Sequence, residues 1–184
     1  MLFRSEAVRK HTRLPLEVHL MIEHPGNYIE LYAKAGADII QVQVECYGER
    51  RAACQAFGQY PKEVNQIFPA KLRADLKRIK DLGKRPYVVF NPGTPLIPDA
   101  LTDCDGVLVM SVNPGYAGQK FMSHIPQKIE QLAKVFKGEI AVDGGVNGET
   151  ALLCVKAGAR VLITASYLYG SKDMAGTVRD LKAL

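Results

Sequence analysis

The chain has 184 residues, of which 47% are hydrophobic, and a formal net charge of +5. This length suits one domain, and the charged start and the lack of a long apolar run predict neither a signal peptide nor a membrane span. Its four cysteines form no Cys-x-x-Cys pair, which argues against a zinc knuckle or a disulfide framework. We expect a soluble, cytoplasmic, single-domain protein.

The positive charge is spread through helical patterns such as KLRADLKRIK and does not gather into one stripe. Proteins that bind nucleic acid usually concentrate basic residues on one face, so solvated helix faces are the better interpretation here. We therefore predict neither a nucleic-acid partner nor a membrane partner.

Short apolar runs alternate with amphipathic patterns along the chain. The runs typical of buried strands cover 16–22, 39–44, 86–91, 106–112, 139–145 and 161–167. The patterns that predict helices cover 27–37, 71–83, 125–136 and 148–159. This alternation predicts a parallel sheet, either open and doubly wound or closed into a barrel. Because a barrel of eight units needs about 200 residues or more, units are missing or the sheet is open.

An unusually long stretch separates the second predicted strand from the next predicted helix. It covers residues 46–70 and is either an insertion on a strand-to-helix loop or an additional helix. On a barrel such a loop lies on the functional face, where it could act as a lid or an oligomer contact. A surface embellishment without a role is an equal alternative.

The ends of the predicted strands are the first place to look for a site, since ligands of parallel α/β proteins bind there. Asp143 ends an apolar strand and precedes Gly144 and Gly145, whose backbone N–H groups can approach an anion. It is the leading candidate for an acid/base group or a metal ligand. Alternatively, Asp143 begins a turn or caps the helix that contains Glu149.

Three glycine-containing loops follow the last predicted strands. They are NPGYAGQKF at 113–121, VDGGV at 142–146 and TASYLYGS at 164–171. The last two are followed by predicted helices, whose N-terminal dipoles favour anions. Each loop alone indicates only a turn, but together they could surround one phosphate.

Three more side chains end strands. His19 could bind a divalent metal or could only form a hydrogen bond within the mouth of a barrel. Met21 and Met110 could line a pocket, although methionines more often fill a core.

Several motifs together resemble one family, the ribulose-phosphate 3-epimerases. From about residue 8 to residue 170 they run LPLEVHLMIEHPGNYI, AGADII, NPGTP, VLVMSVNPGYAGQKF, KIEQL, VDGGVNGETA and AGARVLITAS. The resemblance implies a TIM-type (β/α) barrel that converts D-ribulose 5-phosphate into D-xylulose 5-phosphate at C3. It also implies a divalent metal, zinc or iron(II), that stabilises an enediolate, and two aspartates that exchange the proton.

The same resemblance assigns roles to individual residues. It implies that His19 and Asp143 are metal ligands and that Asp143 also delivers the proton. Met21 and Met110 match methionines that line the pocket. The residues that match the substrate and phosphate loops, together with His19, are Gly115, Tyr116, Ala117, Gly118, Gly144, Gly145, Ala165 and Ser166.

The chain also departs from the family pattern. Family members begin with a strand that carries a motif like SILSAD and a second strand with His-x-Asp, and neither motif occurs here. We therefore expect a barrel of the ribulose-phosphate-binding type with its first two βα units missing. Gln43 stands where the family has histidine, and Ala165 where it has glycine. The two strand edges left open predict a homo-oligomer.

Three hypotheses remain open. The first is an epimerase of ribulose 5-phosphate or of a related hexulose phosphate, and the second is a non-catalytic phosphosugar-binding barrel remnant. The third is a relative of the hexulose-phosphate synthases or decarboxylases, against which the loop SVNPGYAGQKF argues.

Overall fold

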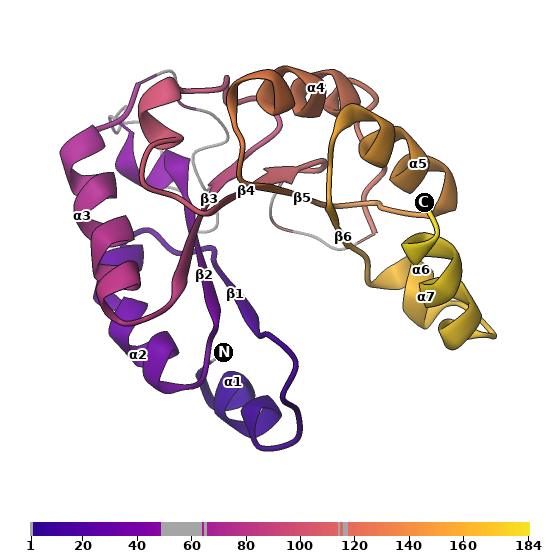
Figure 1. The fold of residues 1–184 in the computed structure, drawn as a ribbon, viewed down its shortest axis with the longest axis horizontal. Helices are drawn as coiled ribbons and strands as arrows, with labels where there is room; N and C mark the ends of the chain where they lie inside the picture. Colours follow the sequence, from indigo (N-terminus) through magenta and orange to yellow (C-terminus); the bar gives the residue numbers. More distant parts are fainter. Residues whose placement is uncertain (1, 49–63, 65, 114, 116–117) are drawn as a thin grey trace.

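The computed structural model describes residues 2–48, 64, 66–113, 115 and 118–184. Within these residues six parallel strands form one sheet, in which neighbours in sequence are also neighbours in space (Figure 1). The strands are β1 (Glu17–Leu20), β2 (Ile39–Gln43), β3 (Arg85–Phe90), β4 (Gly106–Met110), β5 (Glu139–Asp143) and β6 (Val161–Ile163). All six predicted strands are therefore confirmed.

Helices connect the strands. The α-helices are α1 (Leu2–Arg9), α2 (Ile29–Lys34), α3 (Pro69–Asp81), α4 (Ile125–Val135), α5 (Gly148–Ala157), α6 (Ser166–Tyr169) and α7 (Met174–Lys182). Short 3-10 helices are η1 (Pro25–Asn27), η2 (Val44–Tyr47) and η3 (Pro98–Ala100). The four predicted helices correspond to α2 through α5. No helix in the described part of the chain is both long enough and apolar enough to cross a membrane.

Most of the predicted insertion at 46–70 lies outside the described residues. At its two ends Gly48 and Ile67 form an isolated antiparallel bridge, and the carbonyl oxygen of Tyr47 accepts a hydrogen bond from the N–H of Phe68 at 2.7 Å. The bridge brings the two ends of the segment together beside η2. The choice between a loop insertion and an additional helix stays open.

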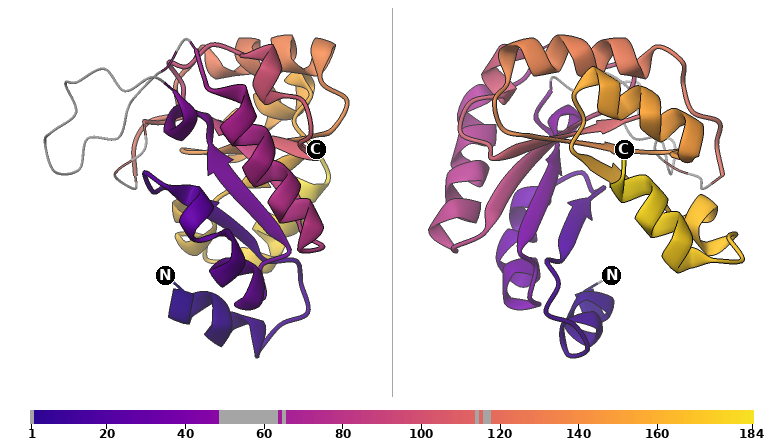
Figure 2. Two further views of the ribbon diagram at one scale, coloured as in Figure 1. Left: turned by 90° about the vertical axis from the view of Figure 1, so that its left-hand side faces the viewer. Right: turned by 45° about the vertical axis from the view of Figure 1, so that its right-hand side comes forward.

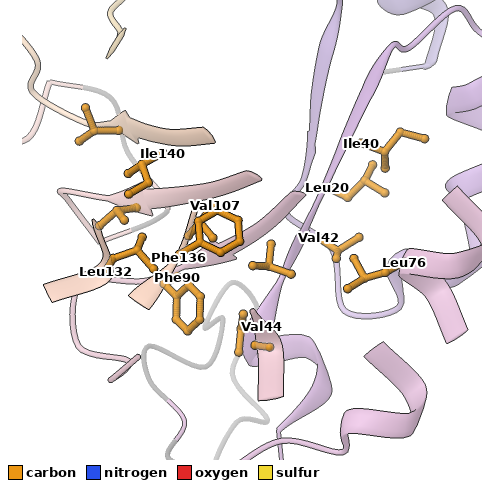
Figure 3. Close-up of a cluster of buried hydrophobic side chains, with 14 of the residues drawn as sticks. Leu20, Ile40, Val42, Val44, Leu76, Phe90, Val107, Leu132, Phe136 and Ile140 are labelled. Carbon is orange, nitrogen blue, oxygen red and sulfur yellow. The ribbon is translucent and has the colours of Figure 1, made fainter. Parts of the chain in front are cut away.

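The sheet curls into a half-barrel with its connecting helices on the convex face (Figures 1 and 2). The larger hydrophobic core joins alternate strand side chains to residues of α2, α3, α4 and α5. Figure 3 shows one part of it, where Leu76 of α3 lies against Val42 of β2. The open, doubly wound alternative is wrong, because these four helices all pack into one core on one face of the sheet.

The opposite set of strand side chains faces the concave side. Val89, Leu108, Met110 and Ala141 form a second buried cluster there. All strands run in the same direction, so their carboxyl ends lie together at one edge of the half-barrel. We call this edge the carboxyl rim and define it by the strand ends Leu20, Gln43, Phe90, Met110, Asp143 and Ile163.

Candidate functional site

Asp143 ends β5 at the carboxyl rim and is half-buried. Burial raises the pKa of its carboxyl group, and a hydrogen bond from the backbone of Gly144 offsets part of that rise. The capping alternative is wrong, because the side chain of Asn147 caps α5 by accepting from the N–H groups of Glu149 and Thr150, each at 3.0 Å. The Asp143 carboxylate therefore does not cap the helix that follows it.

Two glycines bring the loop after β5 against the loop after β4. Gly144 and Gly145 have φ angles of 113° and 63°, a region that suits glycine. A Cβ atom on Gly144 would lie 2.6 Å from a methyl group of Val112, and one on Gly145 would lie 2.8 Å from the backbone nitrogen of Phe121. Side chains at these positions would force the two loops apart, so the absence of a side chain at Gly144 and Gly145 permits the loops after β4 and β5 to lie close together.

Ser111 ties the same two strand ends together. Its backbone N–H and its hydroxyl group each donate to the carbonyl oxygen of Asp143 at 2.7 Å, and the hydroxyl also lies within hydrogen-bonding distance of the carbonyl oxygen of Gly144. Its own carbonyl oxygen accepts from the N–H of Met122 at 3.0 Å. No role for Ser111 was predicted from the sequence. Its position directly after β4 was the signal that could have found it.

The predicted phosphate loop after β4 is closed at its base. The side-chain amide of Gln119 donates to the carbonyl oxygen of Asn113 at 2.6 Å. Gly115 and Gly118 are exposed and have φ angles of 139° and 79°, and a Cβ atom at either position would have no atom of the described residues within 4 Å beyond its chain neighbours. The candidate contacts at 116–117 lie outside the described residues.

The third predicted phosphate loop follows β6. Ala165 and Ser166 are exposed, and Ser166 begins α6. The hydroxyl group of Thr164 donates to the carbonyl oxygen of Val146 at 2.9 Å and so joins this loop to the one after β5. The helix that follows this loop is α7, whereas α6 lies within the loop and has only 4 residues, so that the dipole of α6 is weak. Anion binding here would depend on single N–H groups.

His19 lies on the concave side of β1 and contacts Gln43 of β2. Burial lowers the pKa of His19 to about 4, so the ring is neutral at pH 7. Its Nε2 atom lies 3.1 Å from the side-chain nitrogen of Gln43, as expected when the amide donates to the neutral ring. The other end of this fully buried amide, Oε1, has no hydrogen-bond partner among the described residues. From the sequence, Gln43 was visible only as a departure from the histidine of the family pattern.

The two predicted pocket methionines lie in one cluster. Met110 is buried, and Met21 packs against the same concave-side cluster from the β1 side. Met110 is also paired in register with Asp143, which in turn pairs with Ile163. The structure thus places apolar side chains beside the candidate acid.

The two predicted metal ligands come from strands that are not neighbours, since β2, β3 and β4 separate His19 on β1 from Asp143 on β5. The described part of the chain contains no group of three or more His, Cys, Asp or Glu side chains placed to hold a metal ion. Catalytic zinc sites normally use three protein ligands, so the described donor set does not fit a metal centre. The divalent metal, zinc or iron(II), stays a prediction.

A buried polar cluster fixes the loop that follows β3 at the same rim. The Nζ atom of Lys128 donates to the carbonyl oxygens of Asn91 and Thr94 at 2.7 and 2.5 Å. One oxygen of Glu45 accepts from the N–H of Asn91 at 2.9 Å and from the hydroxyl of Thr94 at 2.5 Å. These contacts join η2, the 91–94 loop and α4, and the sequence analysis did not predict them.

In this chain a curled parallel sheet has its convex face covered by helices, and the candidate ligand groups lie at or near its carboxyl rim. These features define the class of TIM-type barrel enzymes. The family model described as the ribulose-phosphate 3 epimerase family matches residues 2–169. The ribulose-phosphate 3-epimerase of Bacillus subtilis (strain 168) is 40% identical, over 96% of this chain and 75% of that protein. That of Methanocaldococcus jannaschii is 37% identical, over 97% of this chain and 69% of that protein. The chain belongs to the ribulose-phosphate 3-epimerase family, a family of isomerases.

Solved structures support the fold. The 3-keto-L-gulonate-6-phosphate decarboxylase of Vibrio cholerae superposes with a TM-score of 0.71 at 16% identity, covering 99% of this chain and 77% of that one. The 3-hexulose-6-phosphate synthase of Salmonella typhimurium gives 0.68 at 19% identity, covering 99% and 78%. At such low identity these likenesses show the fold alone, and the sequence relatives decide the family.

Proposed function

We propose that this protein is a ketose-phosphate epimerase that interconverts D-ribulose 5-phosphate and D-xylulose 5-phosphate by proton transfer at C3. The observation that carries the proposal is the Asp143 carboxyl group, which lies on the carboxyl rim, does not cap the following helix and has a pKa raised by burial. The family to which the chain belongs supports the choice of substrate.

The chemistry asked of Asp143 is a proton transfer. The hydrogen on C3 is acidic because C3 adjoins the C2 carbonyl, and loss of that proton gives an enediolate. A carboxylate with a raised pKa is a better base, and in its protonated form it can deliver a proton to the same face of the enediolate. Inversion also needs an acid or base on the opposite face, a role that the resemblance gives to the His-x-Asp motif, which does not occur in this sequence. The apolar side chains of Met110 and Ile163 lie beside Asp143 and favour this raised pKa by limiting its hydration.

The substrate phosphate is assigned to the three loops at the end of the sheet. The backbone N–H groups of Gly118, Gly145 and Ser166 are candidate donors, since glycine leaves its N–H accessible and Ser166 is exposed. Ala165 precedes Ser166 and adds only a methyl group. The direct contact between the loops after β4 and β5 supports a shared anion site.

A sugar hydroxyl group is assigned to the pair His19 and Gln43. The unsatisfied Oε1 atom of Gln43 is a buried acceptor, and a substrate hydroxyl could donate to it. Because the described donors do not fit a metal centre, no step of the proposed reaction is assigned to a metal. Zinc or iron(II) is proposed on the resemblance alone.

The test is proton NMR of ribulose 5-phosphate in deuterated water with the purified chain, with and without added zinc or iron(II). We expect the C3 proton signal to disappear and Asp143→Asn to slow this exchange by about 100-fold or more, the usual contribution of a general acid or base. The matched control is Asp81→Asn, which removes an exposed carboxylate on α3 and should leave the rate unchanged.

Two results would select the alternatives. Saturable phosphosugar binding, seen by phosphorus NMR, without any proton exchange would favour a non-catalytic barrel remnant. Faster exchange with a hexulose phosphate than with ribulose 5-phosphate would favour the related hexulose epimerase. Equal exchange rates for the wild type and Asp143→Asn would remove Asp143 from the mechanism.

A further inference from the structure

Ser111 is a polar residue at the end of an apolar run. It is the one hydroxyl-bearing residue of the run GVLVMSV at 106–112, and it is fully buried directly after β4. A buried hydroxyl group that lacks hydrogen-bond partners destabilises a protein. The partners of Ser111 therefore indicate what a serine does at this position.

The contacts of Ser111 hold two consecutive carbonyl groups at the carboxyl rim. Its backbone N–H and its hydroxyl group both donate to the carbonyl oxygen of Asp143, each at 2.7 Å. The hydroxyl group also lies within hydrogen-bonding distance of the carbonyl oxygen of Gly144. Because the hydroxyl group makes this second contact, a variant without it keeps the backbone contact to Asp143 and loses the contact to Gly144.

One rigid peptide unit links these contacts to the carboxyl group of Asp143. A trans peptide is planar, so its C=O and N–H groups point in opposite directions. The oxygen of the peptide between Asp143 and Gly144 points at Ser111, and the N–H of the same peptide donates to the Asp143 carboxylate. A contact that fixes the oxygen therefore also fixes the N–H group that holds the carboxylate.

The backbone at Gly144 needs such a restraint. Glycine has access to more backbone conformations than other residues, so the peptide groups on its two sides rotate more easily. A Cβ atom on Gly144 would lie 3.0 Å from the Oγ atom of Ser111, which shows that the hydroxyl group packs directly against the glycine. The hydroxyl group therefore restrains the backbone at the point where it is least restrained by its own residue type.

Two other hydroxyl groups hold the next carbonyl groups of the same loop. The hydroxyl of Thr150 donates to the carbonyl oxygen of Gly145 at 3.2 Å, and that of Thr164 donates to the carbonyl oxygen of Val146 at 2.9 Å. Three side chains from different elements thus hold four consecutive carbonyl groups. Among these three contacts, those of Ser111 are the ones that reach the peptide of the candidate acid.

We propose that Ser111 is a positioning residue for the proton transfer: its hydroxyl group holds the backbone at 143–144 so that the Gly144 N–H keeps the Asp143 carboxylate in one orientation. Ser111 itself exchanges no proton with the substrate. This inference rests on the proposed function, because it names the group that orients the acid and base of that reaction.

The first test measures loss of the C3 proton at a series of ribulose 5-phosphate concentrations, which gives kcat and KM separately. Ser111→Ala should lower kcat about tenfold and leave KM unchanged, because a misplaced catalytic group slows the chemical step and not substrate binding. Ser111→Thr keeps the hydroxyl group and should restore most of kcat. Ser123→Ala is the matched control, since Ser123 is exposed and should be replaced without effect.

The second test does not depend on activity. In isotope-labelled protein, the amide proton signal of Gly144 should move upfield in Ser111→Ala, because its hydrogen bond to the Asp143 carboxylate is weakened. The signal should stay in place in Ser123→Ala. The remaining amide signals of each variant report whether the variant is folded.

Three outcomes would overturn the role of Ser111. They are an unchanged kcat in Ser111→Ala, an equal loss of kcat in Ser111→Ala and Ser111→Thr, and a Gly144 amide signal that does not move. A wild-type chain that catalyses no exchange would instead count against the proposed epimerase. In that case the Gly144 signal still decides whether the Ser111 hydroxyl group holds the backbone beside the Asp143 carboxylate.

Discussion

At the scale of single residues, His19 should make the stability of the protein sensitive to acid. Its pKa in the folded state is about 4, below the ordinary value of 6.5, because burial disfavours the charged ring. Between these two values the unfolded chain binds a proton that the folded chain does not. This contribution therefore lowers stability as pH falls from 6.5 to 4, by at most about 3 kcal/mol, and is absent at higher pH.

The measurement is urea unfolding at pH 7, 6 and 5 without added metal. The difference in unfolding free energy between the wild type and His19→Gln should change with pH below 6.5, with the wild type losing more. His124→Gln removes an exposed histidine and should leave the wild-type pH dependence unaltered. Parallel pH curves for the wild type and His19→Gln would contradict the assignment.

Several candidate residues could be found from the sequence because strand ends are visible in it. Asp143, His19 and Met110 each end an apolar run, and the structure places all three on the concave side or the rim. The contact between His19 and Gln43 could not be found in this way, since it depends on the register of β1 against β2. The position of Ser111 after a predicted strand could be read from the sequence, but the carbonyl groups to which its hydroxyl group donates could not.

At the scale of elements, the buried Lys128 links α4 to the 91–94 loop through its hydrogen bonds to the backbone carbonyl groups of that loop. Burial lowers its pKa to about 8, while the charge of Glu45 works in the opposite direction. We expect Lys128→Met to destabilise the protein by about 3 kcal/mol, because it leaves buried carbonyl groups without donors and Glu45 without a nearby positive charge.

Urea unfolding at pH 7 checks this expectation against Lys134→Met. Lys134 lies on the same helix, and its side chain forms an exposed ion pair with Glu130 at 3.1 Å, so its loss should cost about 0.5 kcal/mol or less. A similar effect of the two substitutions would mean that Lys128 is tolerated and does not stabilise the loop.

Four of the seven α-helices in the described residues, α2 through α5, could be predicted from their periodicity, and the periodicity of α4 contained a signal for Lys128. This residue is in phase with Ile125, Ile129 and Leu132, all fully buried, so the helical pattern places a lysine on the apolar side of α4. The partner groups could not be predicted, because they come from η2 and from the loop after β3. Those segments are distant from α4 in the sequence, and the arrangement of the strands brings them to it.

At the scale of the whole molecule, the count of six strands was visible in the sequence, whereas the curvature of the sheet was not. An alternation of strands and helices is shared by open and closed parallel sheets. What distinguishes the half-barrel is that α2, α3, α4 and α5 all pack on one face, a property of the crossovers in space. The concave side, with Met110 and Asp143 at its rim, follows from that packing.

The strands in the middle of the sheet are buried more completely than β6 at its end, which predicts that local stability differs along the sheet. Native-state hydrogen exchange can measure this difference. The amides of β2 through β5 should exchange slowest, because these strands have neighbours on both edges and are mostly buried. Those of β6, α6 and α7 should exchange faster by local opening, since neither helix has a buried residue. Uniform protection across the sheet and its helices would contradict the uneven stability.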